Sequence, residues 1–178
     1  MLSIRSFIGT HDEHWEDPQF YTHDSIELTA VLTGHGRFRW GQRESLIAPG
    51  HIVAIPSGVA HSFHAVSPIR FGVILVDGMG AELHALFETL LEQAGDPNII
   101  TLSHLDKQEY EALFRQWLKI ASSALKEPER NASAWLQVLM LFLAERSSKH
   151  HQAASIADIA DEIRQHPGRP VHIADLAK

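Results

Sequence analysis

Two histidines and one glutamate, His23, Glu27 and His61, are the residues in this sequence best suited to chemistry. Two imidazole nitrogens and a carboxylate oxygen are ligands that Zn²⁺, Fe²⁺ and Ni²⁺ accept. The same side chains can instead form a polar triad without a metal, hydrogen-bonded to a sugar or to water. The residue types therefore leave two interpretations open, a divalent metal site and a polar binding site without a cofactor.

The residues next to Glu27 indicate a β-strand that would direct its carboxylate into a shared space. Alternate residues of a strand lie on the same face, so Thr29 and Val31 accompany Glu27, and the intervening apolar residues lie on the other face. A carboxylate in such a strand needs water or a polar partner. We expect the mouth of a β-barrel to supply both, with His23 arriving from the preceding segment and His61 from a later strand.

Aromatic side chains provide a second indication of binding. Phe38 and Trp40 alternate onto one face of a predicted strand, as do His61 and Phe63. Sugars and aromatic acids bind between such rings and a few polar groups, although each ring alone can equally belong to the core. We expect the histidines at 11 and 14 at the surface. The predicted ligand-binding residues are Tyr21, His23, Glu27, Thr29, Phe38, Trp40, His61 and Phe63.

The chain divides into two parts with different sequence patterns. As far as about residue 77, short apolar runs are separated by glycine and proline, which is typical of an antiparallel sandwich or barrel. After residue 80, apolar residues recur at helical spacing and predict helices at 80–95, 106–126 and 131–147, the last capped by Asn131. A polar linker is expected over 147–152, then a fourth helix over 155–165 and a fifth beginning at about 171.

The composition narrows the class of protein. With 178 residues, of which 44% are hydrophobic, the chain can bury a proper core. It has no cysteine, which excludes disulfides, thiolate metal sites and a cysteine nucleophile. The formal net charge of −7 makes direct binding to DNA phosphates by this chain unfavourable. Its most apolar stretch is too short to cross a bilayer, so we expect no membrane partner.

The spacing of glycines, prolines and histidines resembles the two consensus motifs of the cupin superfamily. Cupin domains are small β-barrels. The first motif matches at His23, Glu27 and Gly34, and the sequence departs from it at Tyr21, where metal-binding cupins carry a further histidine. The second motif departs at position 65, where alanine replaces a frequent asparagine. It matches at Gly50, Pro56, Gly58 and His61.

The end of the chain, over 156–166 and 170–177, resembles the opening of the DNA-binding domain of AraC-family transcription regulators. In that family a cupin-like barrel, a helical pair used for dimerisation, a linker and two helix-turn-helix units follow one another. The resemblance implies an α+β fold, a cupin-like antiparallel β-barrel followed by a helical dimerisation segment. It divides the chain into a ligand-binding barrel (1–78), a dimerisation segment (79–148) and a linker with the start of the helix-turn-helix domain (149–178).

The resemblance implies an effector-sensing, dimerising domain of a cytoplasmic regulator that is not an enzyme. Its expected partners are a small polar effector, either a sugar or an aromatic or organic acid, and a second copy of the chain. DNA would be bound only through a C-terminal domain beyond Lys178. The alternative is a metal-dependent cupin enzyme, a dioxygenase or sugar isomerase, with Zn, Ni or Fe held by His23, Glu27 and His61. The residues do not identify the effector, the operator or the direction of regulation.

Overall fold

A computed structural model describes residues 1–91 and 93–165 of the chain. Seven strands come first, followed by a helix, an eighth strand and two further helices. The strands are β1 (Ser3–His11), β2 (Ile26–Thr33), β3 (Gly36–Trp40), β4 (Arg43–Ile47), β5 (His51–Ile55), β6 (His61–Ala65), β7 (Ile69–Asp77) and β8 (Asn98–Thr101). The helices are α1 (Ala81–Glu88), α2 (His104–Ser122) and α3 (Pro128–Gln165).

The strands form two antiparallel sheets that enclose the barrel interior. The larger sheet has the order β1-β7-β2-β5-β8, and the smaller has the order β4-β3-β6. Gly34 makes the close turn between β2 and β3 at a φ of 81°, where a Cβ atom would lie 2.0 Å from the carbonyl oxygen of Pro68. Only glycine fits this turn without displacing backbone.

Strand β2 separates two hydrophobic cores, as the alternation of its residues predicts. Ile26, Leu28 and Ala30 belong to the core shared with the helices. Val31 belongs to the second core, between the sheets, and Glu27 and Thr29 line the space on that side. The strand therefore presents an apolar face to the helical layer and its polar residues to the barrel interior, which fixes where chemistry can occur.

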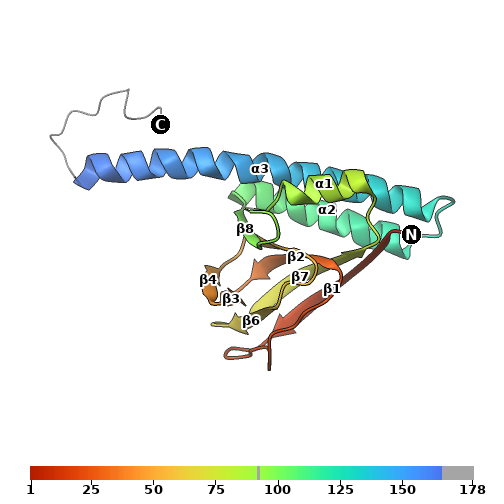
Figure 1. Cartoon of the computed structure of the whole chain (residues 1–178), viewed down its shortest axis with the longest axis horizontal. Coiled ribbons are helices and arrows are strands. Elements are labelled where there is room, and N and C mark those ends of the chain that lie inside the picture. Colours follow the sequence, from red (N-terminus) through yellow and green to blue (C-terminus); the bar gives the residue numbers. More distant parts are fainter. Residues whose placement is uncertain (92, 166–178) are drawn as a thin grey trace.

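The three helices cover one side of the larger sheet, and α3 extends past the edge of the sheets (Figure 1). Helices α2 and α3 are held together by stacking of Trp117 on Trp135, whose ring centroids are 4.8 Å apart. The indole of Trp135 also donates a hydrogen bond of 2.9 Å to the carbonyl oxygen of Leu113. Ser103 caps α2 by accepting a hydrogen bond from the backbone N–H of Asp106. The helices form one layer, and their buried apolar side chains share a core with the larger sheet.

The class of fold is confirmed, an α+β chain with an antiparallel barrel followed by helices, but several elements differ from the predicted ones. The first predicted helix stops at Glu88, and strand β8 extends the larger sheet. The third predicted helix begins earlier, at Pro128, because proline suits the first turn of a helix. Asn131 therefore lies inside α3, and the prediction that it caps the helix is wrong. The linker predicted over 147–152 is also wrong, because α3 continues to Gln165. The predicted fifth helix lies outside the described residues.

Candidate functional site

His23, Glu27 and His61 converge inside the barrel, as their spacing predicts. Glu27 Oε2 lies 2.9 Å from His23 Nε2 and 3.5 Å from His61 Nε2. Its other oxygen, Oε1, accepts a hydrogen bond of 2.5 Å from the hydroxyl of Thr29. Glu27, Thr29 and His61 are buried and His23 is partly buried. Every polar atom of the Glu27 carboxylate therefore has a partner.

Both imidazole rings are held by backbone carbonyl groups on the side away from Glu27. His23 Nδ1 lies 2.9 Å from the carbonyl oxygen of Ser25, and His61 Nδ1 lies 2.9 Å from that of Val59. A carbonyl oxygen can only accept, so each Nδ1 carries the proton. The two Nε2 atoms consequently face the carboxylate, and this orientation is also the one that metal-binding histidines adopt.

The 2.9 Å contact between His23 Nε2 and Glu27 Oε2 contains one proton, which belongs either to the ring or to the carboxyl group. With Nδ1 protonated, the Nε2 atom of His23 can donate to Glu27 only if the ring is an imidazolium. In agreement, the hydrogen bond to Glu27 raises the pKa of His23. Burial opposes the charge on Glu27, but the hydrogen bonds from His23 and Thr29, together with the nearby His61 ring, outweigh it and lower its pKa to about 2. The cluster is an ion pair in the absence of a metal.

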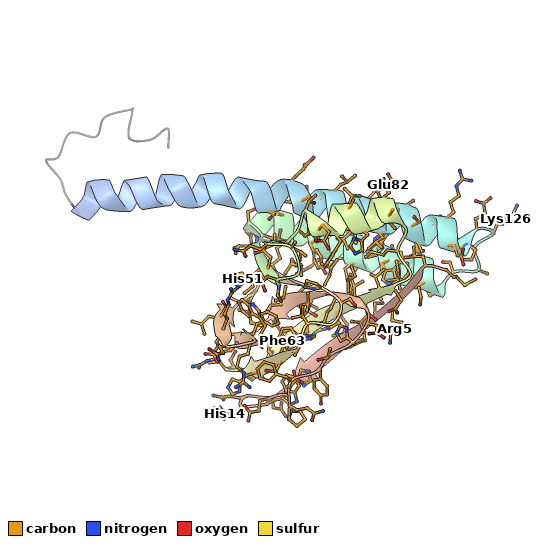
Figure 2. All side chains as sticks on the ribbon, in the orientation of Figure 1. Arg5, His14, His51, Phe63, Glu82 and Lys126 are labelled. Atoms are coloured by element: carbon orange, nitrogen blue, oxygen red, sulfur yellow. The ribbon has the colours of Figure 1, made fainter. Side chains whose placement is uncertain are left out.

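A cavity of about 310 Å³ opens beside this cluster, inside the barrel. Six of the predicted ligand-binding residues line it: Tyr21, His23, Glu27, Thr29, His61 and Phe63. Figure 2 shows Phe63 inside the barrel and His14 at the end farthest from the helices. The rest of the lining comes from β1, β7 and the segment between β1 and β2: Phe7, Gly9, His11, Trp15, Asp17, Phe71, Val73 and Leu75.

Phe38 and Trp40 share the predicted face with Phe63 but do not line the cavity. The ring of Phe38 is fully buried, 5.0 Å from that of Trp40 and 5.1 Å from that of Phe63, in a core completed by Ile47 and Ile55. The barrel interior thus has a filled half and a hollow half. The prediction that these two rings line the cavity is therefore wrong, because they occupy the filled half.

His11, expected at the surface, lies on the cavity wall. Its ring stacks on Trp15, with the ring centroids 3.5 Å apart. Strand β1 pairs with β7 so that Phe7 lies opposite Val73 and Gly9 opposite Phe71. The alternation of residues 7, 9 and 11 in the sequence was the available signal, since residues two apart share a face.

The segment from 12 to 25 serves as an additional wall along β6. The backbone N–H of Tyr21 donates to the carbonyl oxygen of His61, and the N–H of His61 donates back to that of Tyr21. Further along, Ala65 donates to the carbonyl oxygen of Trp15. A segment without a strand pattern is thus fixed by backbone pairing, and this pairing carries Trp15, Asp17 and His23 to the cavity.

Asp17 is the second acidic residue at the cavity. Its carboxylate accepts a hydrogen bond of 2.7 Å from the backbone N–H of Phe63. Burial raises its pKa in spite of that hydrogen bond, and the nearby Glu27 charge adds to the increase. Burial also lowers the pKa of His11, which favours a neutral ring there. The site therefore contains two carboxylates in different surroundings: the charge of Glu27 is compensated by several polar partners, and the charge of Asp17 is much less compensated.

The comparisons with known proteins agree with this architecture. The family of AraC-like ligand binding domains matches residues 9–139. Among solved structures, apo ToxT from Vibrio cholerae superposes with a TM-score of 0.57 at 11% identity, covering 98% of this chain and 69% of ToxT. ToxT from Vibrio cholerae bound to (E)-4-(8-methylnaphthalen-1-yl)but-3-enoic acid superposes with a TM-score of 0.55 at 11% identity, covering 98% of this chain and 70% of ToxT.

A search of curated protein sequences finds no significant match. The likeness to ToxT, at 11% identity, concerns the fold alone. The family match covers most of the chain. It includes the end of β1, the strands β2 to β8, the helices α1 and α2, and the first part of α3. The chain therefore belongs to the family of AraC-like ligand-binding domains.

Proposed function

We propose that this chain is the effector-sensing domain of a transcription regulator and binds a small molecule in the barrel cavity. The observation that carries the proposal is the hollow half of the barrel, which has one polar cluster and an otherwise largely apolar, aromatic wall. Ligand pockets typically combine these two features, an apolar lining and a few polar groups that fix orientation. Membership of a family of ligand-binding domains supports the same interpretation.

The lining favours an effector with an aromatic or other apolar body over a sugar. Sugars need many hydrogen-bond partners, whereas most of the wall is formed by side chains such as Phe7, Phe71, Val73 and Leu75. The polar part of the effector would lie at the cluster around Glu27. In agreement with a pocket of this kind, the ToxT structure described above was solved with a naphthyl-bearing acid bound.

Dimerisation through the helices is the second part of the proposal. Most apolar side chains of α2 and α3 are buried in the core between the helices and the larger sheet, including Leu136, Leu139 and Leu143. Val138 and Leu141 are left on the outer side of α3, with 53% and 46% of their surface exposed. Three residues apart, they lie on one face of the helix. An isologous contact between two copies would cover this face.

DNA binding is proposed only for a C-terminal domain, and the division of the chain at 78 and 148 stays a prediction. A regulator of this type acts in the cytoplasm, where bacterial DNA lies. In the described part of the chain, no helix is long and apolar enough to span a bilayer. A mobility-shift comparison of this chain with a chain extended through helix-turn-helix units tests the DNA part. Specific binding by the short chain would contradict it.

One observation supports the second candidate, a metal-dependent cupin enzyme. One ligand atom from each of His23, Glu27 and His61 lies within 4.8 Å of the others, and the Nε2 atoms already face the carboxylate. This donor set fits three ligands of a divalent cation such as Zn²⁺, Ni²⁺ or Fe²⁺. Such an ion would activate bound water or polarise a substrate oxygen. Elemental analysis of protein purified without a nickel column distinguishes this candidate from a regulator without a metal.

A thermal-shift screen of the chain against aromatic and aliphatic small molecules tests effector binding. A ligand at a hundred times its Kd stabilises the folded state by about 2.7 kcal/mol. Val73→Trp would fill the cavity and abolish the shift, because Val73 lies on its wall. Leu46→Trp places the same ring on the exposed side of β4, outside the cavity lining, and should preserve the shift. Equal shifts in both variants would place binding elsewhere and contradict the proposal.

A further inference from the structure

The charges around the cavity are unbalanced. Two carboxylates line it, Asp17 and Glu27, and no lysine or arginine is present among its fourteen lining residues. Arg5 lies on the same face of β1 as the lining residue Phe7 but is occupied elsewhere. Its guanidinium contacts Asp77 Oδ2 at 3.2 Å and Ser25 Oγ at 2.8 Å. The cavity wall therefore supplies no fixed cation beyond the histidines.

The two carboxylates differ in how their charge is compensated. Glu27 has His23, His61 and Thr29 within hydrogen-bonding reach or close to it. The Asp17 carboxylate, in the part of the chain that the structure describes, accepts a single hydrogen bond, from the backbone N–H of Phe63, and forms no ion pair. A carboxylate that is partly buried with one neutral donor favours an additional cationic partner.

The aromatic rings of the wall add to this preference. Phe7, Trp15, Tyr21, Phe63 and Phe71 all line the cavity. The face of an aromatic ring is electronegative and attracts an ammonium group within about 6 Å of its centroid. A wall of rings that also carries an acid is the arrangement by which proteins recognise organic cations.

We propose that the effector is an amine, with a protonated nitrogen directed at Asp17 and an apolar body lying among the rings. This inference rests on the proposed function, because it specifies the ligand of the same cavity. An effector carboxylate would be desolvated beside two protein carboxylates without a lysine or arginine to receive it. An ammonium group would instead neutralise Asp17 and keep its apolar part in contact with the wall.

Three probes that share a naphthylethyl body and differ in the terminal group separate the alternatives: 2-(1-naphthyl)ethylamine, 2-(1-naphthyl)ethanol and 3-(1-naphthyl)propanoate. Binding is measured by calorimetry and thermal shift at pH 7 on the intact chain, with EDTA present so that no metal bridges probe and protein. We expect the amine to bind about tenfold or more tightly than the alcohol, because both can donate a hydrogen bond to Asp17 but only the ammonium group also forms an ion pair with it. The propanoate should bind most weakly.

Asp17→Asn is the decisive variant. An asparagine oxygen can still accept the hydrogen bond from Phe63, so the wall keeps its backbone contact while losing its charge. The amine should lose its advantage over the alcohol, whose own affinity should fall much less because the alcohol carries no charge. Asp24→Asn, an exposed acid of the same segment that does not line the cavity, should leave all three affinities unchanged.

The outcomes separate this inference from the function on which it rests. Tighter binding of the propanoate or the alcohol, abolished by Val73→Trp, would overturn the amine and leave the binding cavity standing. An amine preference that survives Asp17→Asn would also overturn it, because the charge would then be recognised elsewhere. If no probe bound, the amine inference would be rejected, and the proposed function would be judged by the wider screen.

Discussion

Removing His23 from the buried cluster is the perturbation that most directly tests the description of the site. In His23→Leu, Glu27 loses its shortest ionic contact, the one at 2.9 Å, while its carboxylate stays almost fully enclosed, with 8% of the side chain exposed. The surroundings lower the pKa of Glu27 from 4.5 to about 2. At about 1.4 kcal/mol for each pH unit, they favour the ionised form by about 3 kcal/mol.

His23, His61 and Thr29 share this compensation, so we expect His23→Leu to lower the free energy of unfolding at pH 7 by at most about 3 kcal/mol, the low end of the 3–5 kcal/mol typical of a broken buried ion pair. His64→Leu is a matched control. His23 and His64 each expose 28% of their side chains and each faces a glutamate, but the partner of His64, Glu16, is 58% exposed. Water can solvate Glu16 when its partner is lost, so the control should cost about 1 kcal/mol or less.

Urea denaturation at pH 7, followed by tryptophan fluorescence, measures these losses. The double variant His23→Leu with Glu27→Gln completes the comparison, because it removes the stranded charge together with its partner. It should recover a large part of the loss caused by His23→Leu alone. Strictly additive losses, or equal losses from His23→Leu and His64→Leu, would refute the buried ion pair as described.

Three further predictions concern acid stability, the β2–β3 turn and assembly. Because the folded pKa of Glu27 lies below its unfolded value, its stabilisation is complete above about pH 4.5 and is lost as the pH falls towards 2, a loss that acid titration of Glu27→Gln should not show. Gly34→Ala should cost about 3–5 kcal/mol by thermal denaturation, because it adds a clash with backbone to the cost of a positive φ. Gly58→Ala, with a similar φ and open space around it, should cost only about 1–2 kcal/mol, and equal losses would contradict the clash. Light scattering should show a dimer for the wild type and a monomer for Val138→Glu, which charges the exposed face of α3. A wild-type monomer at high concentration would argue against that interface.

Local pattern was sufficient for some parts of the site. The alternation of β2 identified which side of the strand carries Glu27 and Thr29, because a two-residue period leaves no choice once the apolar face is known. The spacing of motif residues brought His23 and His61 to the same place. Such features depend on neighbours in sequence or on a recurring motif, and both are visible in a single chain.

Other parts depend on contacts between distant segments and were missed. The segment from 12 to 25 has no strand pattern, and its position follows from backbone pairing with β6, whose residues come about 40 to 50 positions later in the chain. Phe38 has the predicted orientation, but whether its end of the barrel is filled depends on the volumes of residues such as Ile47 and Ile55. Strand β8 is only four residues long, and pairing with β5 defines it.

The position of β2 between the two cores has a thermodynamic consequence. One backbone separates Glu27 on the cavity wall from Leu28, whose side chain is in the core shared with the helices. We therefore expect a displacement of this strand by an occupant of the cavity to change the packing of α2 and α3. Energetic coupling between two sites is reciprocal. Under the proposed function, a second copy bound at the helices would change the affinity of the cavity for its occupant by the same factor as the occupant changes the affinity of the two copies, so the two can be measured as one linked equilibrium.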